Sequence, residues 1–134
     1  MEARAYLEQV ERLNLYIAEA ERKIGKLKAV ATSTTAQMGG ERVSSSSNQQ
    51  KMADAVIRYS DIEREELIPF KRKTADFLHT LERVKVRMRF VVLYEHYFNG
   101  KSFKRISKEK RYSYSHIVRA HREGLAELQE ILDE

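Results

Sequence analysis

The chain has 134 residues, of which 42% are hydrophobic and 34% charged, with a formal net charge of +5. This length fits one ordinary domain, or a small domain that carries an extended arm. No run of about 18 apolar residues is present, which excludes a membrane span, and the charged start lacks the apolar core of a secretory signal. Because the sequence contains no cysteine, disulfides and thiolate metal sites are excluded, which favours a cytoplasmic protein.

The sequence holds no pattern typical of an enzyme or a metal site. We find no glycine-rich phosphate loop, no convergent carboxylate pair and no nucleophile beside a histidine. A cluster of glutamates at residues 63–66 fits a solvated helix face. The four histidines lack the spacing of metal ligands: His79, His96, His116 and His121. We therefore expect no catalytic residues, no metal and no cofactor.

The scarcity of helix breakers, with one proline and five glycines, predicts an all-α fold. From Tyr6 to Ala31 the apolar residues follow at alternating steps of four and three, a heptad stripe over more than three repeats. The stripe predicts a first helix over residues 2–31 that buries one face against a partner helix. The oligomerisation residues predicted on it are Val10, Leu13, Ile17, Ile24 and Leu27.

Residues 32–50 lose helical preference because they are rich in serine, threonine and glycine. They predict a connecting loop, or a contact loop that becomes ordered on binding. A second helix is expected to begin near Ser47 or Asn48, either of which suits an N-cap.

The second helix is expected to end near Leu81 or Glu82. Its apolar stripe shifts by one residue between Ile62 and Leu67, close to the single proline, Pro69. A proline predicts a kink or break there. Residues 1–82 thus form a helical hairpin or a coiled-coil arm, paired within the chain or in a dimer bundle.

Residues 83–134 predict a separate head of three shorter helices. The first covers residues 84–98 and stops at Asn99-Gly100, because both residue types tolerate the left-handed conformation. The second is a short basic helix with Ser102 as N-cap, ending near Lys110. A four-residue link, 111–114, leads to the last helix, capped by Ser113. Its buried stripe is Ile117, His121, Leu125, Leu128 and Leu132.

Two short helices joined by a short turn, the second basic at its start, are typical of a helix-turn-helix. Residues 84–122 contain eleven lysines or arginines and only two acids, whereas residues 123–134 contain five acids and no base. Such a basic block is the footprint of a nucleic-acid-binding protein. A solvated helical surface is the alternative reading.

The last helix at 113–125 is the predicted recognition helix, because its outward hydroxyl, imidazole and guanidinium groups can pair with base edges. The predicted base-reading residues are Ser115, His116, Arg119 and Arg122. The predicted contacts to the DNA backbone, which give affinity without sequence reading, are Lys101, Lys104, Arg105, Lys108, Ser113 and Tyr114. Since His121 lies on the buried stripe, we expect a core histidine. Tyr112 and Tyr114 are expected to pack in the turn rather than read bases.

The segment from Val91 to Leu125, which includes VVLYEHYFNGKSFKRIS and YSYSHIVRAHREGL, resembles region 4 of bacterial sigma factors. This resemblance implies that the helix at 113–125 reads a promoter element. The DNA-facing positions that it implies are Tyr114, Ser115, His116, Arg119 and Arg122. This sequence departs from the family pattern at two positions. Lys110 stands where the family prefers an apolar residue, and Arg111 stands where it usually has glycine. If the backbone of Arg111 is left-handed, the arginine costs about 1 kcal/mol.

The whole chain is similar to small phage and prophage proteins of Gram-positive bacteria, grouped with the ArpU- and RinA-like regulators of late transcription. The features it shares are the heptad helix, the Ser-rich loop, the KMADAV segment (Lys51–Val56) and the sigma-like C-terminus, in this order. The implied function is a sequence-specific transcription regulator. Its expected partners are double-stranded DNA, host RNA polymerase and further copies of the chain in a homodimer or higher oligomer.

Two other functions remain open from the sequence. One is a DNA-packaging protein like the small terminase subunits. A ring of eight or more subunits would favour this function. The other is a helical adaptor that binds RNA polymerase or a sigma factor without reading DNA. The acidic segment 123–134 supports the adaptor, because acids at a helix C-terminus oppose the helix dipole and attract a basic partner.

Overall fold

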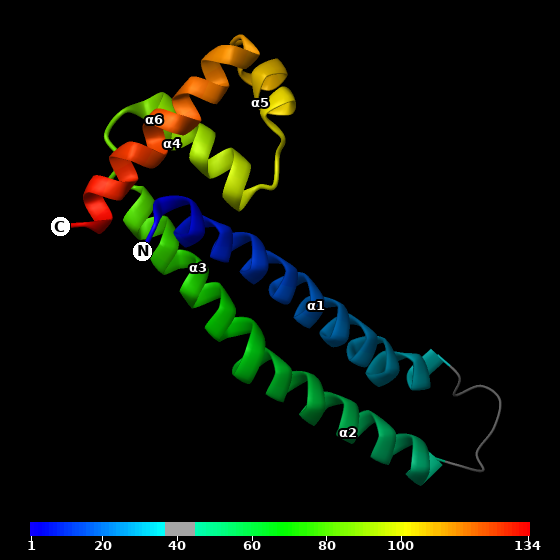
Figure 1. The fold of residues 1–134 in the computed structure, drawn as a ribbon. Helices are drawn as coiled ribbons and strands as arrows, with labels where there is room; N and C mark the ends of the chain where they lie inside the picture. Colours follow the sequence, from blue (N-terminus) through cyan, green and yellow to red (C-terminus); the bar gives the residue numbers. More distant parts are fainter. Residues whose placement is uncertain (37–44) are drawn as a thin grey trace. The chain divides into compact units, whose positions relative to one another are not determined.

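The computed structural model describes residues 1–36 and 45–134, and every regular element in these residues is a helix (Figure 1). The prediction of an all-α chain is confirmed. In this part of the chain no helix combines the length and apolar character needed to cross a membrane. The α-helices are α1 (Ala3–Ala36), α2 (Ser45–Ile62), α3 (Ile68–Leu81), α4 (Arg87–Leu93), α5 (Phe103–Lys110) and α6 (Tyr114–Leu132), with π-helical segments η1 (Glu63–Leu67) and η2 (Tyr94–Phe98).

The predicted loop at 32–50 is helical at both of its ends. α1 continues to Ala36 instead of ending near Ala31, and α2 begins at Ser45 instead of Ser47 or Asn48. Thr32 tolerates the helix because its hydroxyl donates to the carbonyl of Lys28, 3.0 Å away, one turn back along the helix. The rest of the predicted loop, residues 37–44, lies outside the described residues.

The shift in the apolar stripe near Pro69 is caused by a π-helical turn. The N–H of Ile68 bonds to the carbonyl of Glu63, five residues earlier. Such a turn holds one more residue than a regular one, so Ile62 and Leu67 reach the same face. The wider turn also gives room to the proline ring, which clashes with the preceding turn of a regular helix. The predicted discontinuity therefore occurs without a break between α2 and α3.

Residues 15–71 form one compact unit. Its core consists of Ala20, Ile24 and Leu67, with Ile17, Tyr59 and Ile62 partly buried around them. The first part of α1 in this unit pairs with residues 70 and 71, and the later part pairs with residues 66 and 59, so α1 and the segment from α2 to α3 run antiparallel. The pairs are Tyr16 with Phe70, Glu21 with Lys71, Lys23 with Glu66 and Lys28 with Tyr59.

Residues 1–14 and 72–134 form the other compact unit. The start of α1 is tied to the C-terminal region, because the Ala3 N–H donates to Gln129 Oε1 at 2.7 Å and Asn14 Nδ2 donates to the Phe98 carbonyl at 2.9 Å. The predicted boundary between residues 82 and 83 stays a prediction. The buried residues of this core are Ala3, Leu7, Leu81, Val84, Leu93, Tyr97 and Leu128.

A second core in this unit joins α4, α5 and α6. It consists of buried Val92, Ile106, Ile117 and Ala120, with Met88 and Phe103 packed against it. α4 begins at Arg87 rather than near residue 84, because Val84 belongs to a turn in which its N–H bonds to the Leu81 carbonyl. At the end of η2, Gly100 takes the left-handed conformation with φ of 67°. The helix therefore stops at the predicted Asn-Gly pair.

Candidate nucleic-acid interface

A serine side chain caps the start of both α5 and α6, as the sequence predicts. Ser102 Oγ accepts from the Arg105 N–H at 3.1 Å, and Ser113 Oγ accepts from the His116 N–H at 3.2 Å. Each cap satisfies one of the backbone N–H groups that the first turn of a helix leaves without a partner. The link between the helices has three residues rather than four, because Tyr114 is already helical.

Arg111 sits in the left-handed region, with φ of 61° and ψ of 42°. Its N–H bonds to the carbonyl of Ser107 and so closes the end of α5. A glycine would adopt this conformation without strain, whereas the Cβ of arginine crowds the following carbonyl. The turn thus places arginine in a backbone conformation that glycine favours.

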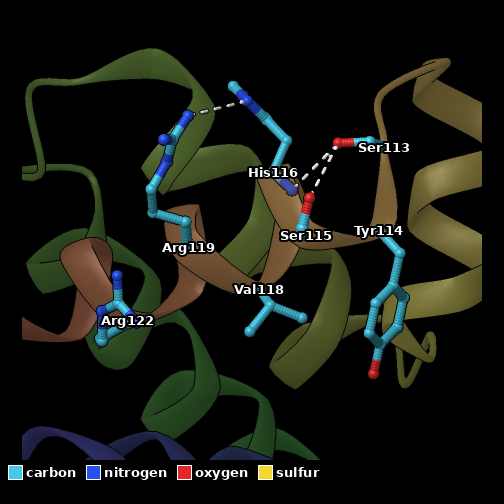
Figure 2. A pocket seen from close by; sticks show the side chains of 7 residues that line it. All are labelled: Ser113, Tyr114, Ser115, His116, Val118, Arg119 and Arg122. Carbon is cyan, nitrogen blue, oxygen red and sulfur yellow. Dashed lines mark hydrogen bonds between the residues drawn. The ribbon is translucent and has the colours of Figure 1, made fainter.

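The four predicted base-reading residues lie together at the start of α6 (Figure 2). They line a shallow surface depression of about 500 Å³. Ser115, Arg119 and Arg122 are exposed, and His116 is half-buried. The full lining is Ser113, Tyr114, Ser115, His116, Val118, Arg119 and Arg122. These residues present hydroxyl, imidazole and guanidinium groups and no carboxylate.

Val118 is the one lining residue that the sequence reasoning missed. It is partly buried and lines the same depression as His116 and Arg119 (Figure 2). The available signal was its position, because a valine outside the buried stripe of an amphipathic helix has no partner within the helix. An apolar side chain at such a place can contact the methyl group of thymine.

The two tyrosines of the turn lie at its surface. Tyr112 is 45% exposed and Tyr114 is 54% exposed. Tyr112 stacks on the ring of His116, with centroids 4.7 Å apart and planes inclined by 16°. Neither tyrosine belongs to the neighbouring core, which contains Ile106 and Ile117.

The cations predicted to contact phosphates differ in how free they are. Lys104 and Lys108 are exposed and form no salt bridge among the described residues. Arg105 is exposed as well, with its Nε 2.9 Å from Glu109 Oε1. These three side chains of α5 remain able to reach a phosphate.

Lys101 is instead engaged within the chain. Its Nζ lies 2.6 Å from Glu95 Oε2 and 2.7 Å from Glu109 Oε2, and the side chain is only 19% exposed. Hydrogen bonds to Glu109 and Glu95 raise the pKa of Lys101. Because two carboxylates already balance its charge, Lys101 holds α5 to η2 and is poorly placed to bind a phosphate.

His121 is a core residue, as predicted, and is 7% exposed. Its Nε2 lies 2.8 Å from the hydroxyl of Tyr97, and its ring packs 4.8 Å from that of Phe103. Burial, with smaller effects of nearby His96 and Arg4, lowers the pKa of His121 to about 4. The imidazole is therefore neutral near pH 7 and helps to hold α6 against α5 and η2.

The acidic end of α6 is largely paired inside its own unit. Glu127 Oε1 lies 2.9 Å from Arg89 Nη1, and Glu127 Oε2 accepts from the Lys85 N–H at 2.6 Å. Glu134 pairs with Arg83. These contacts fasten the end of α6 to the turn before α4 and to α4 itself.

The predicted oligomerisation residues are covered to different degrees by the chain itself. Val10, Leu13 and Ile24 are buried, and Ile17 and Leu27 are partly buried. A second copy of the chain could not reach the three buried side chains in this conformation. Oligomerisation itself stays a prediction.

Within the described ranges, no group of three or more histidine or acidic side chains is placed to hold a metal ion. No protein-family model, curated protein or solved structure matches this chain. Function is therefore inferred from the geometry and charge of the depression at the start of α6.

Proposed function

We propose that this protein is a sequence-specific DNA-binding transcription regulator, with α5 and α6 acting as a helix-turn-helix and α6 as the recognition helix. One observation carries the proposal. The exposed start of α6 gathers Ser115, His116, Arg119 and Arg122 in a depression without a carboxylate. A surface of this composition matches the hydrogen-bond acceptors that the major groove presents, above all O6 and N7 of guanine.

The proposed roles follow from which side chains line the depression or are exposed beside it. Ser115, His116, Arg119 and Arg122 read base edges, and Val118 meets a thymine methyl group. Lys104, Arg105 and Lys108 bind phosphates beside the groove, which sets register and affinity. Ser113 caps the first turn of α6. Ser113 and Tyr114 contact the DNA backbone where this turn enters the groove.

In the proposed assembly the chain combines an oligomerisation arm with a helix-turn-helix head. A dimer would place two heads on half-sites about one DNA turn apart. The resemblance to sigma region 4 and to phage late regulators supports promoter DNA as the target and host RNA polymerase as a further partner. Since Val10, Leu13 and Ile24 are buried, the copies would meet through other residues.

The adaptor without DNA reading loses its main support. That reading relied on a free acidic segment, whereas Glu127 and Glu134 form ion pairs with Arg89 and Arg83 in the same unit. Neutralised acids attract a basic partner weakly. If a column of the immobilised protein retains RNA polymerase, and Arg119→Ala retains it equally well, the adaptor function would be favoured again.

The test is the affinity of the purified protein for duplex DNA, measured by fluorescence anisotropy at two salt concentrations. A duplex enriched from a random pool by the protein should bind more tightly than a scrambled duplex, with a steep dependence on salt. Sedimentation of the same sample gives the oligomeric state, and a ring of eight or more copies would favour the packaging reading. Equal affinity for both duplexes would contradict the proposal.

Two variants separate reading from general attraction. Arg119→Ala should reduce the discrimination between the two duplexes by about 1–3 kcal/mol, because the lost contact is to a base. Lys104→Ala should weaken binding to both duplexes alike and lower the salt slope by about one, because the lost contact is to a phosphate. Equal effects of both variants would remove the recognition role of α6.

A further inference from the structure

The guanidinium of Arg119 is contacted on two sides in the free protein. Its Nε lies 4.0 Å from Glu123 Oε1, one turn further along α6. Its Nη2 lies 3.4 Å from His116 Nδ1, one turn earlier (Figure 2). Arg122, by contrast, forms no salt bridge among the described residues. The two arginines of the reading surface are thus restrained to different degrees.

Glu123 is itself held in place by a neighbouring helix. Its second oxygen, Oε2, lies 3.3 Å from Nη2 of Arg89 on α4, while its first oxygen faces Arg119. Arg89 is in turn fixed by Glu127, with Nη1 2.9 Å from Oε1. Hydrogen bonding to Glu127 raises the pKa of Arg89 against the effect of its partial burial. The carboxylate of Glu123 therefore bridges a supported arginine and the reading arginine.

The geometry of the contact decides what it does for DNA reading. The carboxylate of Glu123 lies on the Nε side of the guanidinium, and no salt bridge to Nη1 or Nη2 is present among the described residues. These are the nitrogens that donate together to O6 and N7 of a guanine. A long side chain that is held before binding loses less conformational freedom when the complex forms. The contact to His116 is long, so Nη2 can exchange it for a base.

We propose that Glu123 is a positioning residue for specificity. It aims Arg119 at a guanine, and this positioning favours DNA in which a guanine accepts from Arg119. The inference rests on the proposed DNA-reading function of α6. Glu123 touches no base in this scheme and acts through Arg119.

The test uses the full chain and two probes: a duplex enriched from a random pool by the wild-type protein, and its scrambled counterpart. The quantity measured is the ratio of the two dissociation constants. Glu123→Gln should lower this ratio by about three- to tenfold, a part of the roughly five- to 150-fold that a bidentate guanine contact supplies. The loss should come mainly from weaker binding to the enriched duplex, because the guanidinium of Arg119 is no longer held toward its guanine.

Glu130→Gln is the matched control, because Glu130 is an exposed acid further along α6 with no salt bridge among the described residues. It removes the same charge and should change both dissociation constants by a similar factor. Its ratio should therefore equal that of the wild type. A fall in the ratio as large as that of Glu123→Gln would overturn the proposal.

A double-mutant cycle separates positioning from a general effect of charge. In the Arg119→Ala background, Glu123→Gln should leave the ratio unchanged, because no guanidinium remains to be aimed. The same fall in both backgrounds would overturn the proposal. A wild-type protein that shows no preference for the enriched duplex would instead overturn the DNA-reading function itself, and the inference with it.

A measurement on the wild-type protein alone covers the case in which a variant fails to fold. The Nε–H order parameter of Arg119 in solution should exceed that of Arg122, since only Arg119 is restrained from both sides. Equal order parameters would overturn the inference without affecting the proposed function.

Discussion

At the scale of single residues, Arg111 holds a conformation that glycine would adopt more easily. Its φ of 61° is the one positive value among non-glycine residues in the described chain. Arg111→Gly should raise the free energy of unfolding by about 0.5–1 kcal/mol, because relief of the Cβ clash exceeds the entropy that glycine loses on folding. Urea unfolding measures this gain.

Lys108→Gly is the matched control, because it removes the same charge from the same short helix at a regular helical position. It should lower the free energy of unfolding by about 1 kcal/mol. A loss in Arg111→Gly as well would mean that the left-handed turn is not strained.

His121 gives the unit of residues 1–14 and 72–134 a dependence on pH. Its pKa is about 4 in the folded chain against 6.5 for the free side chain. As the pH falls below 6.5, the unfolded chain therefore takes up a proton that the folded chain resists. The stability that the neutral His121 contributes is fully present above pH 6.5 and is lost as the pH falls from 6.5 to 4. From pH 7 to pH 5 the free energy of unfolding should therefore fall by about 2 kcal/mol.

The measurement is urea unfolding at pH 7 and pH 5 for the wild type and for His121→Leu. The variant keeps a side chain of similar size but cannot titrate, so its loss of stability from pH 7 to pH 5 should be smaller by about the same 2 kcal/mol. Carboxylates contribute equally to both proteins and cancel in the comparison. The same pH dependence in both would show that His121 is not the group responsible.

At the scale of elements, two helical glycines have opposite surroundings. A Cβ at Gly124 would lie 3.1 Å from Cδ1 of buried Leu93 and 3.3 Å from Cβ of Arg89, whereas a Cβ at Gly25 would meet nothing within 4 Å. Gly25→Ala should therefore stabilise the protein by about 1 kcal/mol through helix propensity alone. In Gly124→Ala the crowding of α4 against α6 should cancel or reverse this gain.

The thermal midpoints of the two variants give the comparison. Because both substitutions have the same gain in propensity, the difference between them measures how closely α4 and α6 approach. An equal rise in both midpoints would mean that Leu93 and Arg89 make room for the new Cβ without a loss of stability.

The elements that the sequence predicted well are those set by local rules. The caps at Ser102 and Ser113 and the stop at Gly100 depend on one or two side chains and their own backbone. The sequence did not predict that the backbone forms π-helical turns, although the shift in the apolar stripe marked the position of η1. The sequence shows where a stripe shifts but not how the backbone takes up the extra residue.

The candidate site divides in the same way. Helical spacing was sufficient to place Ser115, Arg119 and Arg122 on one surface. Spacing could not reveal that Lys101 is bound by Glu95 and Glu109, because Glu95 lies on another element. Ion pairs between elements depend on the fold, and they decide which cations remain able to bind a further anion.

At the scale of the whole molecule, the sequence pattern gave no sign that residues 1–14 pack with the C-terminal third. A heptad stripe states that a face is buried but not against which part of the chain. Leu7 is fully buried in the core that contains Leu81 and Leu128. The unit that carries the candidate site therefore includes residues more than 100 positions earlier in the chain.

This dependence predicts that a substitution in the first helix loosens the last one. Leu7→Ala should lower the free energy of unfolding by about 2–5 kcal/mol and weaken the hydrogen-exchange protection of the end of α6 around Leu128. Leu15→Ala, at a side chain that is 69% exposed, should change stability by less than about 0.5 kcal/mol. Unchanged protection at Leu128 in Leu7→Ala would contradict the shared core.

The hydrogen bond between Ala3 and Gln129 spans 126 positions of the chain, and this separation has a consequence during synthesis. A ribosome that adds about 5–20 residues per second needs roughly 6–25 s to pass from one partner to the other. During that interval Leu7 and its neighbours have emerged without the helix that covers them. The unit that carries the candidate site thus closes only after α6 has been made, and a nascent chain that stalls earlier displays an uncovered apolar stripe to chaperones and proteases.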